Sequence, residues 1–447
     1  MIGLIIFGPL PAASVHPWSI LVIQLIVSAL TIGYLVSTLR PQLQDRTIQI
    51  LRWPGYLIAG FWTLILFQIL PLPKLVTRVL SPGTFAFRQS HDPGFSSSAF
   101  LSVSLVPAHT LKTALALLPY FLMGYLIVKT IKKRSQIVRM FLAIYLMGVF
   151  QALYGLLHRY SDSSGFLSGT FISRNHFAGY LEMIIPIGIG LILARPDFMP
   201  LSRLGWKEKL IVLTGKKAAV SLLLLSGVIL MSLALIFTRS RSGALLLVLI
   251  FLIFFFLSFV RAGRNKDLRK GLRSLIVLVF IIILFISLYV GMEATWERLS
   301  PDRLLQESRP GIWKNSLELY SRFPLFGTGL GTFASLYPHM EGDGRLAKIS
   351  HAHNDYLEYL TETGFFGFAL LFLGIFWIYW ECIKRGLRKR HPVMQSLGSG
   401  GLVAVMAILA HGMTDFNLHI PANMMLFSVI LSLTFVTVTY RPSEKGR

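Results

Sequence analysis

Apolar runs long enough to cross a membrane recur along the whole of this 447-residue chain, and they constrain its fold more than any other feature. Examples are Val220–Phe237, Ala244–Val260 and Leu275–Val290. A bilayer core about 30 Å thick requires roughly 20 apolar residues per helix, which these runs supply or nearly supply. The mean hydropathy is +0.64 and only 14% of the residues are charged, against roughly 25% in soluble domains. The sequence therefore predicts an all-α, polytopic transmembrane bundle.

Eleven spans are predicted within a single membrane domain of residues 1–447 when the apolar runs are separated at polar breaks. The segment Met1–Leu10 is also apolar but too short to cross a bilayer. It predicts either a half-helix or the end of a twelfth span that starts upstream, so the bundle has 11–12 spans. The predicted spans are Trp18–Leu39, Pro54–Leu72, Leu111–Val128, Val138–Leu157, Phe177–Ala194, Ala218–Thr238, Ser242–Val260, Ser274–Gly291, Phe365–Trp380, Gly398–His411 and Pro421–Tyr440.

The Lys and Arg residues of the predicted loops lie mostly on one side of the bundle. Loops on that side hold 28 of the 43 basic residues but only six of the 20 acidic ones, which accounts for +22 of the net charge of +23. Such a bias marks the cytoplasmic side of a membrane protein. The high charge therefore reports topology and does not indicate nucleic acid as a partner. These loops are 39–53, 129–139, 195–217, 261–273, 381–391 and 441–447.

Two predicted loops on the opposite, outer side are large. The first, 73–110, is rich in Ser, Pro and Phe, and the second, 292–362, lies between the eighth and ninth predicted spans. Loops of more than about 15 residues are usually functional or disordered. The second loop contains many aromatic residues, among them Trp313 and Tyr337, which disfavours disorder. We therefore predict a small folded extracytoplasmic region with short helices, one of them over Gly311–Ser321.

A polar run from His351 to Glu362 leads into a predicted span from the outer side. His353 is a candidate for proton exchange, because histidine is the side chain best suited to it near neutral pH. Asn354 beside it is a candidate for orienting a substrate by hydrogen bonding. Two alternatives stay open, namely a pair of histidines that cap a helix and a metal site built from His351, His353 and Asp355. The metal site is disfavoured because residues i and i+2 of a helix do not face each other.

Two arginines, Arg239 and Arg241, lie in a tight connection between two long apolar runs, Thr238–Gly243. Arginines at an outer hairpin oppose the positive-inside tendency, so they require a reason. Guanidinium groups beside hydroxyls and the N-terminal amides of a helix form an anion site, particularly for phosphate. The alternative is that both side chains extend to lipid headgroups.

Arg309 stands just before the helix predicted over Gly311–Ser321 and is a further candidate for an anion contact. The glycines downstream, Gly327, Gly329 and Gly331, superficially resemble a nucleotide-binding loop. They follow no strand of a βαβ unit, so the context that such a loop requires is missing. A tight turn or a close approach of two backbones explains the glycines better.

A fourth polar segment, with Arg174, Asn175 and His176, lies at the outer start of a predicted span. Glu182 lies about two helical turns deeper, where an ionisable residue is a functional candidate by default. The alternative is a structural carboxylate paired with a neighbouring helix. One more outer turn carries residues that we expect to support the site or an interface, namely His411, Asp415, Asn417 and His419.

Four of these segments together resemble the O-antigen ligase and O-antigen polymerase superfamily of bacterial envelope glycosyltransferases. Each is modest on its own, but their order and spacing are similar to those of the family, and they cover residues 169–368. The segments are His353-Asn354 followed by Gly364 and Gly367, Ser240–Gly243, Arg309 and Trp313 followed by Pro324–Gly327, and Arg174–Leu181.

The resemblance implies an inverting glycosyltransferase in the bacterial inner membrane that needs neither a metal nor another cofactor. Its donor would be a glycan on undecaprenyl diphosphate at the periplasmic face, surrounded by membrane lipids. By the same resemblance, Arg241 and Arg309 would bind the diphosphate and His353 would act as the catalytic base on an acceptor hydroxyl. The remaining candidates for contacts with the substrate are Arg174, Asn175, His176, Glu182, Arg239 and Asn354.

The acceptor stays open between a lipid A-core sugar, a second lipid-linked glycan and a protein hydroxyl. These acceptors correspond to a ligase, a polymerase and a protein O-oligosaccharyltransferase. A different class of protein, a transporter or flippase for lipid-linked glycans, predicts internal repeats and binding residues near the bilayer midplane. The two halves of the chain show no convincing repeat, and the polar candidates lie at the outer rim, so we favour the enzyme.

Overall fold

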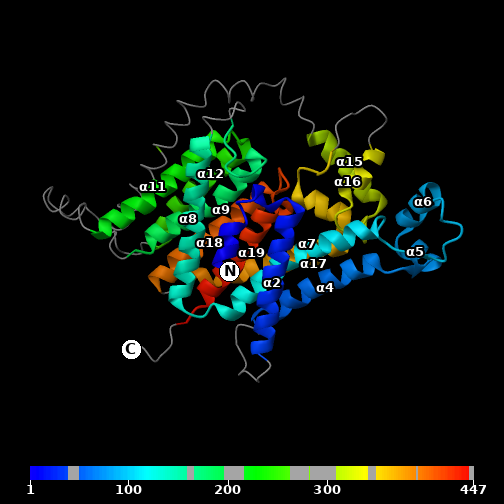
Figure 1. The fold of residues 1–447 in the computed structure, drawn as a ribbon, viewed down its shortest axis with the longest axis horizontal. Helices are drawn as coiled ribbons and strands as arrows, with labels where there is room; N and C mark the ends of the chain where they lie inside the picture. The colour runs from blue at the N-terminus through cyan, green and yellow to red at the C-terminus, as the bar shows by residue number, and fades with distance from the viewer. Residues whose placement is uncertain are drawn as a thin grey trace.

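The computed structural model describes residues 1–38, 50–158, 166–195, 216–261, 281, 309–340, 349–388 and 391–441. These residues form a bundle of long helices with a group of shorter elements beside it (Figure 1). The long helices are α2 Pro17–Ser37, α4 Arg52–Ile69, α7 Pro107–Thr130, α8 Arg134–His158, α9 Arg174–Leu193, α11 Lys216–Phe237, α12 Arg241–Arg261, α17 Asp355–Leu387, α18 Pro392–His411 and α19 Pro421–Thr439. The shorter elements are α1 Ile2–Phe7, η1 Ala12–Ser14, β1 Leu72–Pro73, α5 Lys74–Leu80, α6 Pro82–His91, β2 Phe100–Leu101, α15 Arg309–Arg322, α16 Phe333–Leu336, η3 Tyr337–Met340 and η4 Asn417–His419.

The prediction of an all-α membrane bundle is confirmed. Eight of the described helices are long and apolar enough to cross a membrane: α2, α7, α8, α9, α11, α17, α18 and α19. Helices α4 and α12 occupy two more of the predicted spans. The remaining predicted span, Ser274–Gly291, lies outside the described residues apart from Ile281. The apolar start of the chain forms the six-residue helix α1, which packs against α8.

Helix α9 is the centre of the bundle. Almost all of its residues are buried, whereas α2 exposes most of its surface to the surroundings of the bundle. Helices α9 and α18 approach each other through small residues. A Cβ at Gly190 would lie 2.9 Å from the Ser396 carbonyl oxygen, and one at Gly400 would lie 2.8 Å from that of Pro186. Small residues allow helix backbones to pack this closely in a membrane, and here they bring the N-terminus of α9 beside the C-terminus of α18.

The two large outer loops fold together. In the first loop, β1 pairs antiparallel with β2, and α5 and α6 lie between them in sequence. In the second, α15 confirms the helix predicted over Gly311–Ser321, while residues 292–308 and 341–348 of the loop lie outside the described residues. Phe323 at the end of α15 packs against Phe87 of α6, with ring centroids 6.4 Å apart. Helices α5, α6, α15 and α16 accordingly lie together at the right of Figure 1; we call this group the cap.

Helix α17 joins the cap to the bundle and bends where the sequence places a glycine. Gly364 has φ +64°, a conformation that glycine adopts without strain. A Cβ there would lie 2.4 Å from the Leu325 carbonyl oxygen, and one at Gly327 would lie equally close to that of Glu362. The glycine-rich segment after α15 is therefore a close approach of two backbones, as the sequence indicated.

Candidate functional site

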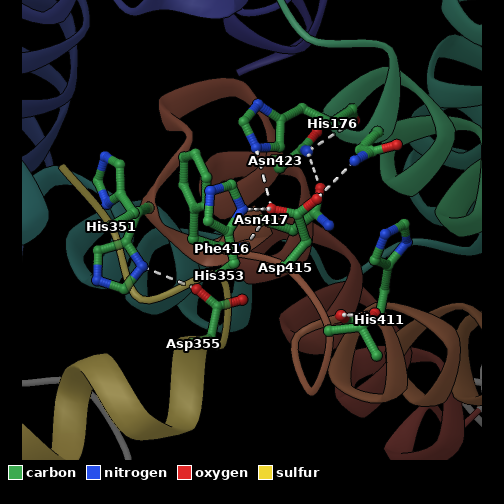
Figure 2. Close-up of polar contacts among 12 residues, drawn as sticks. His176, His351, His353, Asp355, His411, Asp415, Phe416, Asn417 and Asn423 are labelled. Carbon is green, nitrogen blue, oxygen red and sulfur yellow. Dashed lines mark hydrogen bonds and ion pairs between the residues drawn. The ribbon is translucent and has the colours of Figure 1, made fainter. Parts of the chain in front are cut away.

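The turn between α18 and α19, residues 412–420, collects the polar candidates from distant parts of the chain (Figure 2). Helices α9, α12, α15 and α17 all begin beside it. The Asp355 amide donates to the Gly412 carbonyl, and the Ser242 hydroxyl lies 2.9 Å from that of Thr414. The far ends of α9, α12 and α17 lead to the basic connecting segments, so the site lies at the opposite end of the bundle from the concentrated positive charge.

Asp415 is the residue on which the site converges. Its Oδ1 lies 3.2 Å from His353 Nδ1 and 3.7 Å from His176 Nε2. Its Oδ2 accepts a hydrogen bond of 2.9 Å from Asn175 Nδ2 and lies 3.6 Å from Arg309 Nη2. One carboxylate thus joins residues from α9, α15 and the segment before α17. Figure 2 shows several of these side chains pointing toward it.

The surroundings of Asp415 keep it ionised. Its side chain is only 3% exposed, and burial by itself raises the pKa of a carboxyl. The contacts with His176 and His353, together with the charge of Arg309, outweigh burial and hold the pKa of Asp415 well below its usual range. A permanently negative Asp415 favours the tautomer of His353 that carries its proton on Nδ1.

Asn354 fixes the start of α17 next to His353. Its Oδ1 accepts hydrogen bonds from the amides of Tyr356 and Leu357 at 3.0 and 3.1 Å, as an N-cap residue does. Its Nδ2 donates to the Met413 carbonyl at 3.0 Å. The sequence predicted that Asn354 orients a substrate by hydrogen bonding. In the structure Asn354 is the cap that ties α17 to the α18–α19 turn.

The backbone of His353 adopts a conformation that is rare outside glycine. Its φ is +49°, which costs on the order of 1–3 kcal/mol and persists only where the surroundings impose it. The preceding residue, Ala352, is held on both sides: Trp313 Nε1 donates to its carbonyl at 3.1 Å, and its amide donates to Glu358 at 2.8 Å. The His353 side chain is 36% exposed, and none of the described residues hydrogen-bonds its Nε2. The conformation therefore presents one ring nitrogen to Asp415 and leaves the other accessible.

Phe416 provides an apolar surface among three histidines. The His351 ring stacks on it with centroids 4.0 Å apart and an interplanar angle of 10°. The rings of His176 and His353 meet it edge-on, at 4.5 and 5.0 Å. Such contacts restrict the orientation of a ring, so Phe416 positions His353 from one side while Asp415 does so from another (Figure 2).

The four candidate arginines form two groups around this turn. Arg309 begins α15 and reaches Asp415, while Arg241 begins α12 next to Ser242, whose hydroxyl contacts Thr414. Arg174 begins α9 and Arg239 lies between α11 and α12, but both contact Phe166. Their guanidinium carbons lie 4.0 and 5.7 Å from its ring centroid. Arg239 has φ +54°, so the α11–α12 connection is a strained turn.

The N-terminus of α9 is anchored by asparagines of the neighbouring elements. Asn423 Nδ2 donates to the His176 carbonyl at 2.9 Å and to Asn417 Oδ1 at 2.8 Å. Asn417 in turn packs on Gly179, where a Cβ would lie 2.4 Å from its Oδ1. Because Gly179, three residues after His176, has no side chain, the turn that carries Asp415 can pack closely against α9.

A second cluster of histidines and carboxylates lies on the other side of the turn. His419 Nδ1 lies 2.8 Å from Asp355 Oδ1, and its Nε2 lies 3.4 Å from Glu358 Oε1. His351 Nδ1 lies 2.7 Å from the same Glu358 oxygen. Burial lowers the pKa of His419, but Glu358 and Asp355 outweigh it and raise that pKa to about 10. His419 is therefore a buried cation held between two carboxylates.

Glu182 has a buried partner on a neighbouring helix. His411 Nδ1 at the end of α18 lies 3.0 Å from both carboxylate oxygens of Glu182, and the side chains are 1% and 0% exposed. The sequence left two interpretations of Glu182 open, a substrate contact and a structural pair. In the structure Glu182 forms a buried pair with His411 that joins α9 to α18.

The three residues considered for a metal site face different partners. His353 contacts Asp415, His351 contacts Glu358, and Asp355 contacts His419. Within the described parts of the chain, no group of three or more His, Cys, Asp or Glu side chains is arranged to hold a metal ion.

Residues 226–372, about one third of the chain, match the O-antigen ligase family. This match supports the resemblance of the chain to the O-antigen ligase and polymerase superfamily. No curated protein matches it. The matched segment runs from α11 through the first part of α17 and contains Arg239, Arg241, Arg309, His353 and Asn354.

Other parts of the site lie outside the matched segment. The N-terminus of α9 with Arg174–His176 precedes it, and the α18–α19 turn with Asp415 follows it. The matched segment therefore contributes the exposed histidine and three of the four candidate arginines, and the flanking helices contribute Asp415 and the N-terminus of α9.

The sequence does not indicate Asp415 as the centre of the site. It indicates a polar outer turn with His411, Asp415, Asn417 and His419 that supports the site or an interface. The density of ionisable residues in so short a turn was the available signal. What it lacked was the pairing, because Asp415 is 62 residues from His353 and 240 from Asn175 along the chain.

Proposed function

We propose that this protein is a membrane glycosyltransferase that moves a glycan from an undecaprenyl diphosphate carrier to an acceptor hydroxyl on the periplasmic side. We propose a ligase-type or polymerase-type reaction that proceeds without a metal. The observation that carries the proposal is the pair of His353 and Asp415, with Arg309 on the other oxygen of the same carboxylate. A base, its orienting carboxylate and a cation for the leaving group are thus supported by one turn.

The reaction assigns one role to each of these groups. The accessible Nε2 of His353 accepts the proton of the acceptor hydroxyl, while Asp415 holds Nδ1–H and stabilises the imidazolium that forms. The acceptor oxygen forms a bond to the anomeric carbon of the donor as the bond from that carbon to the diphosphate breaks. Attack from the face opposite the leaving group inverts the anomeric centre.

The arginines act on the leaving group. As the lipid diphosphate departs, negative charge develops on its oxygens, and fixed guanidinium groups stabilise that charge through paired hydrogen bonds. Arg309 at the start of α15 contacts Asp415, and Arg241 at the start of α12 precedes Ser242, which contacts Thr414, so we assign both arginines to one bound diphosphate. Arg174 and Arg239, which share Phe166, are assigned to further phosphate or sugar contacts.

The position of the site in the bundle supports the periplasmic assignment. Of the helices that begin at the site, α9, α12 and α17 end in connections rich in Lys and Arg, and such connections stay in the cytoplasm. A transporter would place its binding residues near the midplane, whereas Asp415, His353 and Arg309 all lie at helix ends. The geometry therefore favours transfer at one face of the membrane.

The test is a His353→Ala variant in a deletion strain, with surface polysaccharide and protein level as readouts. We expect loss of polymer transfer with normal membrane expression. His109→Ala is the matched control, because His109 is an exposed histidine on the cap side whose Nδ1 contacts only Ser335 among the bonds described. Normal long-chain polymer in the His353→Ala strain would refute the proposal.

The deletion strain itself separates the acceptors. Single repeat units that accumulate without polymerisation indicate a polymerase. Long chains that stay on the lipid carrier indicate a ligase, and a missing glycan on a protein indicates an O-oligosaccharyltransferase. Movement of lipid-linked glycan across liposomes by purified protein, with no transfer to any acceptor, would favour the transporter instead.

A further inference from the structure

A groove of about 810 Å³ opens between helices α4, α7, α17 and α19, away from the polar site. Helix α4 packs on α17 and α7 packs on α19, and residues of all four helices line the groove. Its volume is in the range of about 300–1,000 Å³ typical of sites for small ligands. Most of the side chains that line it are aliphatic or aromatic, among them Ile58, Trp62, Phe121, Ile375, Phe427 and Leu431.

The charged side chains of the groove lie at one end. Arg52 is the first residue of α4, and Lys129 is in the last turn of α7. Arg52 Nε donates a hydrogen bond of 3.0 Å to the Tyr56 hydroxyl, and Lys129 Nζ lies 5.5 Å from the ring centroid of Tyr125. Both tyrosines also line the groove, and among its described lining residues none is acidic. This end therefore presents two cations and two tyrosines, a combination typical of a membrane interface.

The length of the groove matches one leaflet of a bilayer. Its lining residues extend from Leu118 to Lys129 on α7 and from Met424 to Phe435 on α19. At 1.5 Å per residue each stretch is about 16 Å long, roughly half of a 30 Å hydrocarbon core. The cations lie at the end of the bundle that carries the basic connections, which is opposite to Asp415 and Arg309.

We propose that this groove binds an anionic glycerophospholipid of the leaflet next to the basic connections. Its phosphate lies between Arg52 and Lys129, and an acyl chain fills the apolar groove between α4 and α7. Cationic side chains at the membrane surface attract anionic headgroups. The apolar side chains that line the groove provide the surface that an acyl chain requires. The lipid is distinct from the proposed glycan donor, whose diphosphate belongs with Arg241 and Arg309 at the other end. This inference does not depend on the proposed transfer reaction.

The test is native mass spectrometry of the full-length protein, purified in a non-ionic detergent and titrated with phosphatidylglycerol or phosphatidylcholine. We expect one tightly retained phosphatidylglycerol and weaker retention of phosphatidylcholine. Replacing both cations in Arg52→Gln/Lys129→Gln weakens the retained phosphatidylglycerol by about 30-fold, the scale of two basic side chains near an anionic surface. The matched control is Lys133→Gln/Arg139→Gln, which removes the same charge from the same end outside the groove.

A second variant tests the apolar part without changing charge. Gly55 lines the groove, and a Cβ there would meet no atom within 4 Å. The Cβ of the new side chain in Gly55→Trp therefore fits, and its indole ring fills the groove. Gly33 of α2 is equally open and does not line the groove, so Gly33→Trp is its control. We expect loss of the retained lipid in Gly55→Trp alone. Unchanged retention in both groove variants, or a Gly55→Trp effect on oligomer mass in place of lipid, would overturn the proposal.

Discussion

Two histidine–carboxylate pairs flank the turn between α18 and α19, and they differ mainly in exposure. His353 lies 3.2 Å from Asp415 and has a side chain that is 36% exposed, whereas His419 lies 2.8 Å from Asp355 and is 13% exposed. His419 also places its second ring nitrogen 3.4 Å from Glu358. The first pair thus keeps one nitrogen accessible, and the second uses both nitrogens inside the protein.

The difference supports the proposed division between a histidine that reacts and one that stabilises the fold. A histidine acts as a base only if one ring nitrogen reaches the substrate, and the exposed ring of His353 allows this. A buried histidine between two carboxylates holds a fixed charge and joins elements, as His419 joins η4 to the start of α17. Replacing residues of each pair in turn tests this division.

The largest effect on transfer is expected for Asp415→Asn. The amide no longer stabilises the imidazolium and no longer favours the productive tautomer of His353. We expect the transfer rate of the purified protein with a lipid-linked donor to fall about 10⁴-fold, the scale for an amide in place of the carboxylate that orients a catalytic histidine. A melting temperature near that of the wild type would show that the fold persists. A rate within tenfold of the wild type would remove Asp415 from the mechanism.

Arg309→Lys ranks next. The change keeps the positive charge but loses the paired geometry with which a guanidinium binds phosphate. We expect a fall in transfer rate of about 10²–10³-fold, similar to the loss of one group that stabilises developing charge. Arg322→Lys at the other end of α15 is the control, because Arg322 is 53% exposed and pairs with Glu318 on the surface. Equal rates in the two variants would contradict the role of Arg309.

A smaller effect is expected for Asn175→Ala, which removes one hydrogen bond from Asp415 and leaves its other contacts. A hydrogen bond to a charged group contributes about 1.5 kcal/mol at the low end, which corresponds to roughly tenfold in rate. The measurement is the same transfer assay, with Asn175→Ser as a variant that keeps a hydroxyl donor. A loss as large as that of Asp415→Asn would show that Asn175 acts on the substrate directly.

The smallest effect on the rate per folded molecule is expected for His419→Gln, whose main effect is on stability. The pKa of His419 is raised from about 6.5 in the unfolded chain to about 10. The charged form therefore stabilises the fold fully below pH 6.5, and this contribution is lost as the pH rises through 10. We expect the melting temperature of the wild type to fall between pH 7 and about pH 10 and that of His419→Gln to fall less. Parallel curves for the two proteins would contradict a buried cation at His419.

Several features of this protein were predictable from local sequence. Apolar runs of spanning length predicted ten helices that the structure contains, because the hydrophobic requirement of a bilayer acts on each segment separately. The glycines downstream of Arg309 predicted a tight turn or a close approach of two backbones, and Gly327 indeed lies against the backbone of Glu362. The polar segments that begin α9, α12, α15 and α17 were each predicted as candidates, because ionisable residues at the ends of membrane helices are often functional.

The partners of those residues were not predictable, and the two interpretations of Glu182 show why. The sequence places a carboxylate two turns inside the membrane but does not indicate what faces it. Its contact with His411 depends on the close approach of α9 and α18 through Gly190 and Gly400. A periodic pattern reports which residues are buried, while pairing depends on how helices far apart in the chain pack.

The sequence alone determined that this chain crosses a membrane many times, which side of it is positively charged, and which outer segments carry arginine and histidine. Hydropathy and charge decide these properties residue by residue. Only the tertiary structure decided that Asp415 joins His353, Arg309 and Asn175, and that His419 does not share this role. It also decided where the groove between α4, α7, α17 and α19 lies. These features arise between helices, since a contact between residues hundreds of positions apart exists only once the bundle has packed.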